Sequence, residues 1–136
     1  MKLYFAGSIR GGRADAVLYA RLIAHLKARH TVLTEHVGAP AAFPTVEQGM
    51  TDAAIWAQDM AWLRECDVVV AECSTPSLGV GYELAMAQQL GKPVHIFFCQ
   101  SRGALSAMLT GDPYYHIHFY DDEASLLREL DAALEA

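Results

Sequence analysis

Short apolar runs alternate along this chain with longer segments in which apolar residues recur at helical spacing. The runs predict five β-strands, over residues 2–6, 31–34, 67–72, 93–99 and 116–120. The longer segments predict four helices, over residues 13–29, 52–65, 80–90 and 123–134, with a short helix over 105–109. Val17, Leu18, Leu22, Ile23 and Leu26 form the expected apolar stripe of the first helix, and Ile55, Met60 and Leu63 that of the second.

The order of these elements predicts an α/β fold. Strands that are separated by helices must be parallel and joined by right-handed crossovers. We therefore expect one doubly wound domain over residues 1–136, with a five-stranded, flavodoxin-like or Rossmann-like parallel sheet. Residues 38–50 show no clear period and predict a long loop, a kind of segment that often has a function.

Composition excludes some classes of partner. The chain has 53% hydrophobic residues and a formal net charge of −6, with no stripe of Lys and Arg, so we expect no nucleic-acid binding. The N-terminal apolar run is too short for a signal peptide, and no segment is long enough to span a bilayer. Three cysteines without CxxC spacing indicate reduced thiols in the cytoplasm and no zinc site.

In a parallel sheet, ligands bind at the carboxyl ends of the strands. Three segments reach that edge here: residues 7–12, Glu35 with His36, and residues 74–83. The run from Ser77 to Glu83 is the most informative, because its glycines allow close approach and the start of a helix suits phosphate. Glu83 is expected in the first turn of that helix, pointing into the same pocket.

Most of these residues also have an ordinary structural interpretation. Glu83 stabilises the helix dipole if it has no further role, and Asp59 lies either on the exposed far face of its helix or at the pocket edge beside Glu83. Tyr4 is either a core tyrosine or a residue that orients the nucleophile. Ser106 is typical of a helix cap, and His36 is either an exposed loop residue or a contact for a base.

Residues 7–12 leave two interpretations open as well. They form either a tight turn with a solvated Arg10 or the second wall of an anion site, and they match neither the dinucleotide fingerprint nor a Walker A loop.

Two carboxylates near a sugar are the usual catalytic groups for cleaving a glycosidic bond. One attacks the anomeric carbon, and the other handles the proton of the leaving group.

Taken together, these segments resemble one family, the 2′-deoxynucleoside 5′-monophosphate N-glycosidases of the nucleoside deoxyribosyltransferase superfamily. The stretches that carry the resemblance are residues 3–13, 32–37, 58–63, 67–72, 76–84 and 105–108. They keep the family's order and spacing over most of the chain. The loop over residues 38–50 and the loop after the fourth strand differ from the family's pattern.

The resemblance implies roles for individual residues. Glu83 would be the nucleophile that forms a glycosyl-enzyme intermediate, Asp59 the general acid/base, and Tyr4 the residue that positions carboxylate and sugar. The implied phosphate and sugar site consists of Ser8, Ile9, Arg10, Gly11, Ser77, Gly79, Ser106 and Met108, with His36 on the side of the base. The family also implies a homodimer with shared active sites, in which Ser106 completes the neighbour's site.

The resemblance favours a hydrolase of nucleoside monophosphates that needs no cofactor or metal. Deoxyribosyltransferases that act on unphosphorylated nucleosides have an acidic residue and an amide where this chain has Ser77 and Ser106, and a carboxylate there would repel phosphate. Three alternatives stay open: a deoxyribosyltransferase, a hydrolase of ribonucleotides such as cytidine monophosphate, and a non-catalytic nucleotide-binding module.

Overall fold

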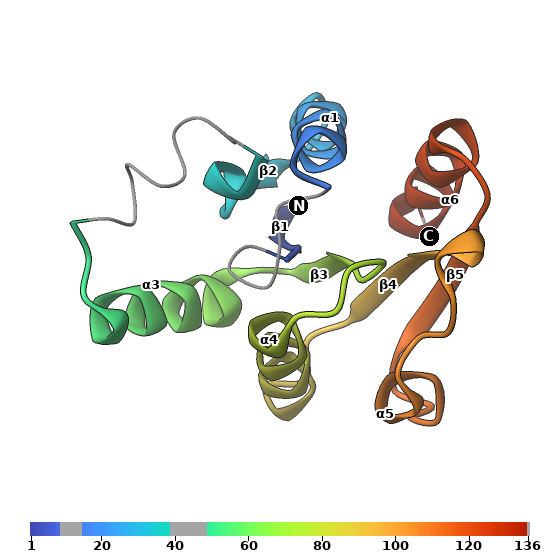
Figure 1. Cartoon of the computed structure of the whole chain (residues 1–136). Helices are drawn as coiled ribbons and strands as arrows, with labels where there is room; N and C mark the ends of the chain where they lie inside the picture. Colours follow the sequence, from blue (N-terminus) through green and yellow to red (C-terminus); the bar gives the residue numbers. More distant parts are fainter. Residues whose placement is uncertain (9–14, 39–48, 136) are drawn as a thin grey trace.

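Five parallel strands form one sheet in the order β2-β1-β3-β4-β5 (Figure 1). The computed structural model describes residues 1–8, 15–38 and 49–135. The strands are β1 (Lys2–Ala6), β2 (Thr31–Val32), β3 (Val68–Glu72), β4 (Val94–Cys99) and β5 (His116–Tyr120). This order is the flavodoxin-like one and confirms the predicted α/β doubly wound architecture.

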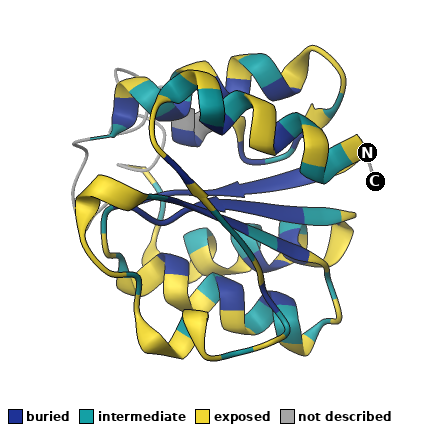
Figure 2. Ribbon diagram, turned by 90° about the vertical axis from the view of Figure 1, so that its right-hand side faces the viewer, coloured by how far each residue is buried: buried dark blue, intermediate teal, exposed yellow. Residues whose placement is uncertain are grey.

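Helices cover both faces of the sheet. Helices α1 (Ala16–Lys27) and α6 (Glu123–Glu135) lie on one side, and α3 (Asp52–Glu65) and α4 (Leu78–Gln89) lie on the other, with the short α5 (Ala107–Thr110) near the edge (Figure 1). Figure 2 shows the buried strands between helices whose outer faces are exposed. No helix within the described ranges is long and apolar enough to cross a membrane.

Successive side chains of each strand point to opposite faces of the sheet, so the buried side chains form two cores, one on each face. Leu3 and Phe5 of β1 pack with α1 and α6, whereas Tyr4, between them, belongs to the core under α3 and α4. Tyr4 pairs in register with Val69 of β3, which faces the same side. Because successive side chains of a strand point to opposite faces, β1 presents its tyrosine to the two helices that follow the long loop.

Strand β2 is shorter than the sequence predicts. It ends at Val32, and a 3₁₀ helix, η1 (Glu35–Gly38), begins soon after it. The Thr34 hydroxyl explains this end, because it donates to the carbonyl oxygen of Phe5 at 2.7 Å and accepts from the Phe5 N–H at 2.8 Å. The hydroxyl thus occupies the Phe5 N–H and carbonyl groups, which a longer β2 would have bonded with its backbone.

Two expected core residues lie elsewhere. Val17 of α1 is 61% exposed, because Ala16, Tyr19, Leu22, Ile23 and Leu26 fill the buried stripe of that helix. Ile55 of α3 is half-buried and lines a pocket, whereas Met60 and Leu63 are buried as predicted. Ile55 therefore lies in a pocket wall and not in the core, which indicates that α3 borders a candidate site.

Candidate active site

Tyr4 lies in the middle of β1 and is 1% exposed. Burial raises the pKa of its phenol far above the usual value, as do the charges of Glu83 and Asp59 and a side-chain hydrogen bond to Glu83. The phenol therefore stays protonated at ordinary pH and serves as the donor in its hydrogen bond to Glu83. Tyr4 is thus a core tyrosine, and its hydroxyl lies close enough to Glu83 and Asp59 for both charges to raise its pKa.

Asp59 belongs to α3, and the cap of this helix sets its position. The Thr51 hydroxyl accepts a hydrogen bond of 3.1 Å from the Ala54 N–H, which fixes the start of the helix. From that start, helical spacing buries Met60 and leaves Asp59 half-buried. Of the two positions that the sequence left open for Asp59, the structure shows the one at the pocket edge.

Glu83 belongs to α4, which begins earlier than predicted. Ser77 caps this helix, and its Oγ accepts a hydrogen bond of 3.3 Å from the Val80 N–H. Because the first helical residue is Leu78, Glu83 falls in the second turn, and the expectation that it lies in the first turn is wrong. A role in stabilising the helix dipole therefore does not explain Glu83, since that effect is confined to the first turn.

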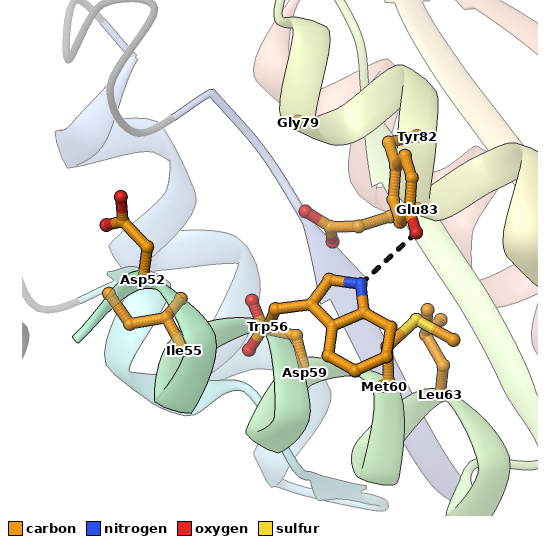
Figure 3. A pocket seen from close by; sticks show the side chains of 9 residues that line it. All are labelled: Asp52, Ile55, Trp56, Asp59, Met60, Leu63, Gly79, Tyr82 and Glu83. Carbon is orange, nitrogen blue, oxygen red and sulfur yellow. Dashed lines mark hydrogen bonds between the residues drawn. The ribbon is translucent and has the colours of Figure 1, made fainter. Parts of the chain in front are cut away.

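Asp59 and Glu83 line one pocket of about 220 Å³ between α3 and α4. Their carboxylates point into the same space, and Tyr82 and Trp56 stand beside them (Figure 3). The other lining residues are Asp52, Ile55, Met60, Leu63 and Gly79. No cluster of His, Cys, Asp and Glu side chains that could hold a metal ion occurs in the described part of the chain.

Gly79 keeps the space beside Glu83 open. A Cβ atom added at Gly79 would lie 3.8 Å from Ser77 Oγ and 3.9 Å from Glu83 Oε1, so this residue stands next to both the capping hydroxyl and the carboxylate. Any side chain here would occupy that space. The structure thus brings Ser77, Gly79 and Glu83 of the sequence motif into one neighbourhood.

The N-terminal loop is described only at its beginning. Ser8 is fully buried, and its N–H donates to the Tyr19 hydroxyl at 3.1 Å. The Ser8 hydroxyl is a buried polar group without a hydrogen-bond partner in the described residues. The other predicted residues of this loop, Ile9, Arg10 and Gly11, lie outside the described residues, as does the side chain of His36 in η1.

Ser106 and Met108 do not line the pocket of the carboxylates. They line a second cavity of about 810 Å³, which Ser77 also lines. Ser106 caps α5 by accepting a hydrogen bond of 3.2 Å from the Met108 N–H, and the Met108 side chain is 82% exposed. Within one chain, Gly79 therefore lines the pocket of the carboxylates, Ser77, Ser106 and Met108 line the second cavity, and Ser8 lines neither.

A buried carboxylate that the sequence did not single out supports the loop before α4. Glu72 ends β3 and is 1% exposed. It accepts hydrogen bonds from the Ser74 N–H at 3.0 Å, the Ser74 hydroxyl at 2.6 Å and the Tyr120 hydroxyl at 2.6 Å. Burial raises the pKa of Glu72, and these donors lower it in part. This network ties the chain leading to Ser77 to the end of β5.

Two aromatic residues of the pocket were also missed as site residues. Trp56 precedes Asp59 by one helical turn, and Tyr82 directly precedes Glu83. Helical spacing was the signal that could have found Trp56, because residues three apart share a helix face. The arrangement as a whole offers two carboxylates, one buried hydroxyl donor and an aromatic rim, which suits acid/base and nucleophilic chemistry at one carbon atom.

The chain is similar to known proteins both in sequence and in fold. A family model described as nucleoside 2-deoxyribosyltransferase matches residues 3–133. The chain is 51% identical over 111 residues to a 5-hydroxymethyl-dUMP N-hydrolase of Mus musculus. That match covers 80% of this chain but 64% of the mouse protein's own length.

A relative of similar size extends the match. The chain is 41% identical over 135 residues to a 5-hydroxymethyl-dUMP N-hydrolase of Danio rerio, covering 95% of this chain and 94% of the relative. Among solved structures, a CMP N-glycosidase of Clostridium botulinum superposes with a TM-score of 0.69 at 20% identity, over 98% of this chain and 99% of that one. At this identity, the structural likeness shows the shared fold.

Proposed function

Because the chain belongs to the nucleoside 2-deoxyribosyltransferase family, we propose that it hydrolyses the N-glycosidic bond of 2′-deoxynucleoside 5′-monophosphates. The products are a nucleobase and deoxyribose 5-phosphate. The observation that carries the proposal is the pocket in which Asp59 and Glu83 meet beside the Tyr4 hydroxyl. The names of the curated relatives support hydrolysis of this bond in a deoxynucleotide.

In the first step, the Glu83 carboxylate attacks C1′ of the sugar. A Glu–C1′ ester bond forms as the N-glycosidic bond breaks, and the base leaves with the bonding electron pair and a proton from the Asp59 carboxyl group. The Tyr4 hydroxyl holds the nucleophile by its hydrogen bond. Because Tyr4 keeps its proton, it does not compete with Asp59 as an acid.

In the second step, water attacks C1′ and the ester bond to Glu83 breaks. Asp59, now ionised, accepts the proton of the attacking water and returns to its starting state. The sugar is released as deoxyribose 5-phosphate, and the Glu83 carboxylate is restored. Both steps use the same pair of carboxylates, so the chemistry needs no metal ion and we expect activity in the presence of a chelator.

The start of α4 supplies the binding site for the phosphate. Its backbone N–H groups and the positive end of its dipole favour an anion, and the hydroxyl of Ser77 stands at the same place. Gly79 lets the sugar approach between Ser77 and Glu83. The roles proposed for Ile9, Arg10 and Gly11 at the phosphate and for His36 at the base fall on residues or side chains outside the described ones, whereas Ser8 is the described residue of the first loop that is proposed for the phosphate side.

We propose a homodimer in which Ser106 and Met108 serve the neighbouring subunit. These residues lie away from the chain's own carboxylate pocket, on an exposed segment that borders the 810 Å³ cavity. Leu78, at the start of α4, is 96% exposed, which leaves apolar surface beside Ser77 for a second copy to cover. In the dimer, Ser106 from one subunit completes the phosphate site of the other.

Complementation between two inactive variants tests the shared site. Glu83→Gln and Ser106→Ala are each expected to be impaired as homodimers. A mixed dimer has one site that combines Glu83 of one chain with Ser106 of the other, so co-expression should restore part of the activity. If purified mixed dimers are no more active than the average of the two homodimeric variants, each chain builds its site alone.

The three cysteines fit a reducing compartment. Cys66, Cys73 and Cys99 are all unpaired in the structure, and two of them are buried. Burial raises the pKa of the Cys66 thiol to about 11 and that of Cys73 to about 12, which keeps both protonated and unreactive. We propose that the protein works in the cytoplasm, where such thiols persist.

A panel of nucleotides tests the function directly. The protein is incubated with deoxynucleoside monophosphates, including 5-hydroxymethyl-dUMP, with the matching ribonucleotides and with the unphosphorylated deoxynucleosides, and released base is measured by chromatography. We expect base release from deoxynucleoside monophosphates and little from the unphosphorylated compounds. Cleavage of cytidine monophosphate instead would identify a ribonucleotide hydrolase.

Two other outcomes would replace the proposal. Equal activity on nucleosides and their monophosphates, with a new nucleoside formed when a second base is added, would identify a deoxyribosyltransferase. Nucleotide binding without base release from any compound would identify a non-catalytic module on the same fold.

A further inference from the structure

Two aromatic side chains border the pocket that holds Asp59 and Glu83. Trp56 lies on α3 and is 51% exposed, and Tyr82 lies on α4 and is 50% exposed. The Trp56 Nε1–H donates a hydrogen bond of 3.1 Å to the Tyr82 hydroxyl, which joins the two helices across the pocket (Figure 3).

The position of this pair follows from the two carboxylates. Trp56 is one helical turn before Asp59, so both side chains stand on the same face of α3. Tyr82 directly precedes Glu83 on α4 and lines the same pocket. Each of the two carboxylates therefore has an aromatic ring of its own helix beside it.

If C1′ sits between the two carboxylates, the base attached to it lies within reach of these rings. A nucleobase is planar and has two π faces, and aromatic side chains bind such faces by stacking. Trp56 has the largest aromatic surface on the pocket, and Ile55 next to it adds an apolar edge. These half-exposed rings therefore offer apolar surface that a base bound in the pocket can cover.

We propose that Trp56 is the stacking surface for the nucleobase and that the Tyr82 hydroxyl fixes its indole ring for that contact. This proposal rests on the nucleotide hydrolase function and adds the residues that hold the leaving group. The hydrogen bond through Nε1 restrains the ring before the base arrives, so less side-chain freedom is lost on binding. The indole binds the base, while the phosphate is bound by other residues.

Kinetics with and without a base separate this role from a structural one. In Trp56→Ala, the KM for a deoxynucleoside monophosphate should rise by about tenfold to a hundredfold. The inhibition constant of deoxyribose 5-phosphate, which has no base, should stay within about twofold of the wild-type value. Trp56→Phe keeps a ring and should show a smaller rise in KM.

Tyr82→Phe tests the hydrogen bond alone. It keeps the ring and removes the acceptor for Nε1, and we expect a rise in KM of about threefold with deoxyribose 5-phosphate again unaffected. Val17→Ala, which shortens an exposed apolar side chain of α1 on the opposite face of the sheet, is the matched control and should leave both constants unchanged.

Fluorescence gives a second and direct measurement. The chain has two tryptophans, so Trp62→Phe leaves Trp56 as the reporter. Addition of a deoxynucleoside monophosphate should quench its emission, whereas deoxyribose 5-phosphate should not. Far-UV circular dichroism confirms that each variant is folded before it is compared.

The result that would overturn the proposal is distinct from failure of the proposed function. If the wild-type protein releases base but Trp56→Ala has an unchanged KM, or has equally weakened binding of nucleotide and deoxyribose 5-phosphate, Trp56 does not bind the base. If the wild-type protein releases no base, the hydrolase function itself is wrong. In that case, quenching by the nucleotide alone would still support the stacking contact.

Discussion

The buried phenol of Tyr4, on β1, donates a hydrogen bond to the carboxylate of Glu83, on α4. This contact links the centre of the sheet to the helix that follows β3. It exists because β1 directs Tyr4 to the side that α3 and α4 cover, and because α4 begins at Leu78 with Glu83 in its second turn. A hydroxyl that keeps its proton can orient a carboxylate and leave it ionised.

Tyr4→Phe should slow catalysis more than it lowers stability. The variant keeps the buried ring and removes the donor to Glu83, so we expect kcat to fall by about tenfold to a hundredfold. The free energy of unfolding should change by about 1–2 kcal/mol. Tyr114→Phe is the control, because the Tyr114 hydroxyl donates to the Lys92 carbonyl away from the pocket. Equal kcat in the two variants would remove Tyr4 from the mechanism.

Asp59→Asn should abolish the proton transfer that assists the leaving base. We expect kcat to fall by about 10²- to 10⁴-fold while the affinity for the nucleotide is retained. The loss should be smaller for substrates whose base is a better leaving group, since these need less protonation. Steady-state rates over a series of bases measure this, and an equal loss for every base would speak against a general acid at position 59.

Gly79→Ala should separate stability from activity. An alanine in this helical position favours folding, and its Cβ would meet Ser77 Oγ and Glu83 Oε1 at ordinary contact distances. We expect stability to rise by about 0.4–1 kcal/mol. KM should rise by about tenfold, which corresponds to roughly 1.4 kcal/mol.

Gly81→Ala is the matched control for this change, because an added Cβ meets nothing within 4 Å on the same helix. It should give a similar gain in stability with an unchanged KM. Thermal unfolding and initial rates measured on both variants decide the matter. A KM that rises equally in both would mean that the helix, and not the space beside Glu83, is responsible.

A histidine cluster predicts how stability depends on pH. His95 Nδ1 lies 3.0 Å from His118 Nε2, and the His95 ring stacks on His116 at 5.0 Å. Burial and then the charges of His118 and His116 lower the pKa of His95 to about 4. Burial also lowers the pKa of His118, which Glu129 raises in part from a distance of 3.6 Å.

The folded state therefore binds fewer protons than the unfolded state between about pH 4 and the ordinary histidine pKa of about 6.5. The free energy of unfolding should fall as the pH is lowered through this range. His95→Gln should flatten the decrease, and urea unfolding at several pH values measures it. An unchanged slope in His95→Gln would show that other groups cause the acid sensitivity.

The fold followed from the sequence where local signals agreed with the final packing. Helix α3 was predicted with its observed bounds, because Thr51 is a strong cap and Met60 and Leu63 mark the core. Strand β5 was also predicted with its observed bounds. The end of β2 was not predictable, because the Thr34 side chain bonds to β1, a partner far away in the sequence.

The site followed only in part. Helical spacing could place Asp59 on either side of α3, and only the packing of α3 against α4 decides that it faces Glu83. Ser77 caps α4, and Glu83 therefore lies in the second turn and not in the first. This start of the helix depends on the backbone geometry of the segment, which its glycines do not reveal. The spacing of Trp56 to Asp59 indicates that both lie on the same face of α3. A tryptophan on a helix, however, is usually interpreted as a core residue, so this spacing alone does not indicate the site.

Base release by the wild-type protein and by Glu83→Gln tests the role of the paired carboxylates most directly. Both proteins are given a deoxynucleoside monophosphate, and base and deoxyribose 5-phosphate are measured together with the affinity for the nucleotide. We expect equimolar products from the wild type, and from Glu83→Gln a rate at least about 10³-fold lower at a similar Kd. A near-normal rate in Glu83→Gln would contradict the assignment of Glu83 as the nucleophile.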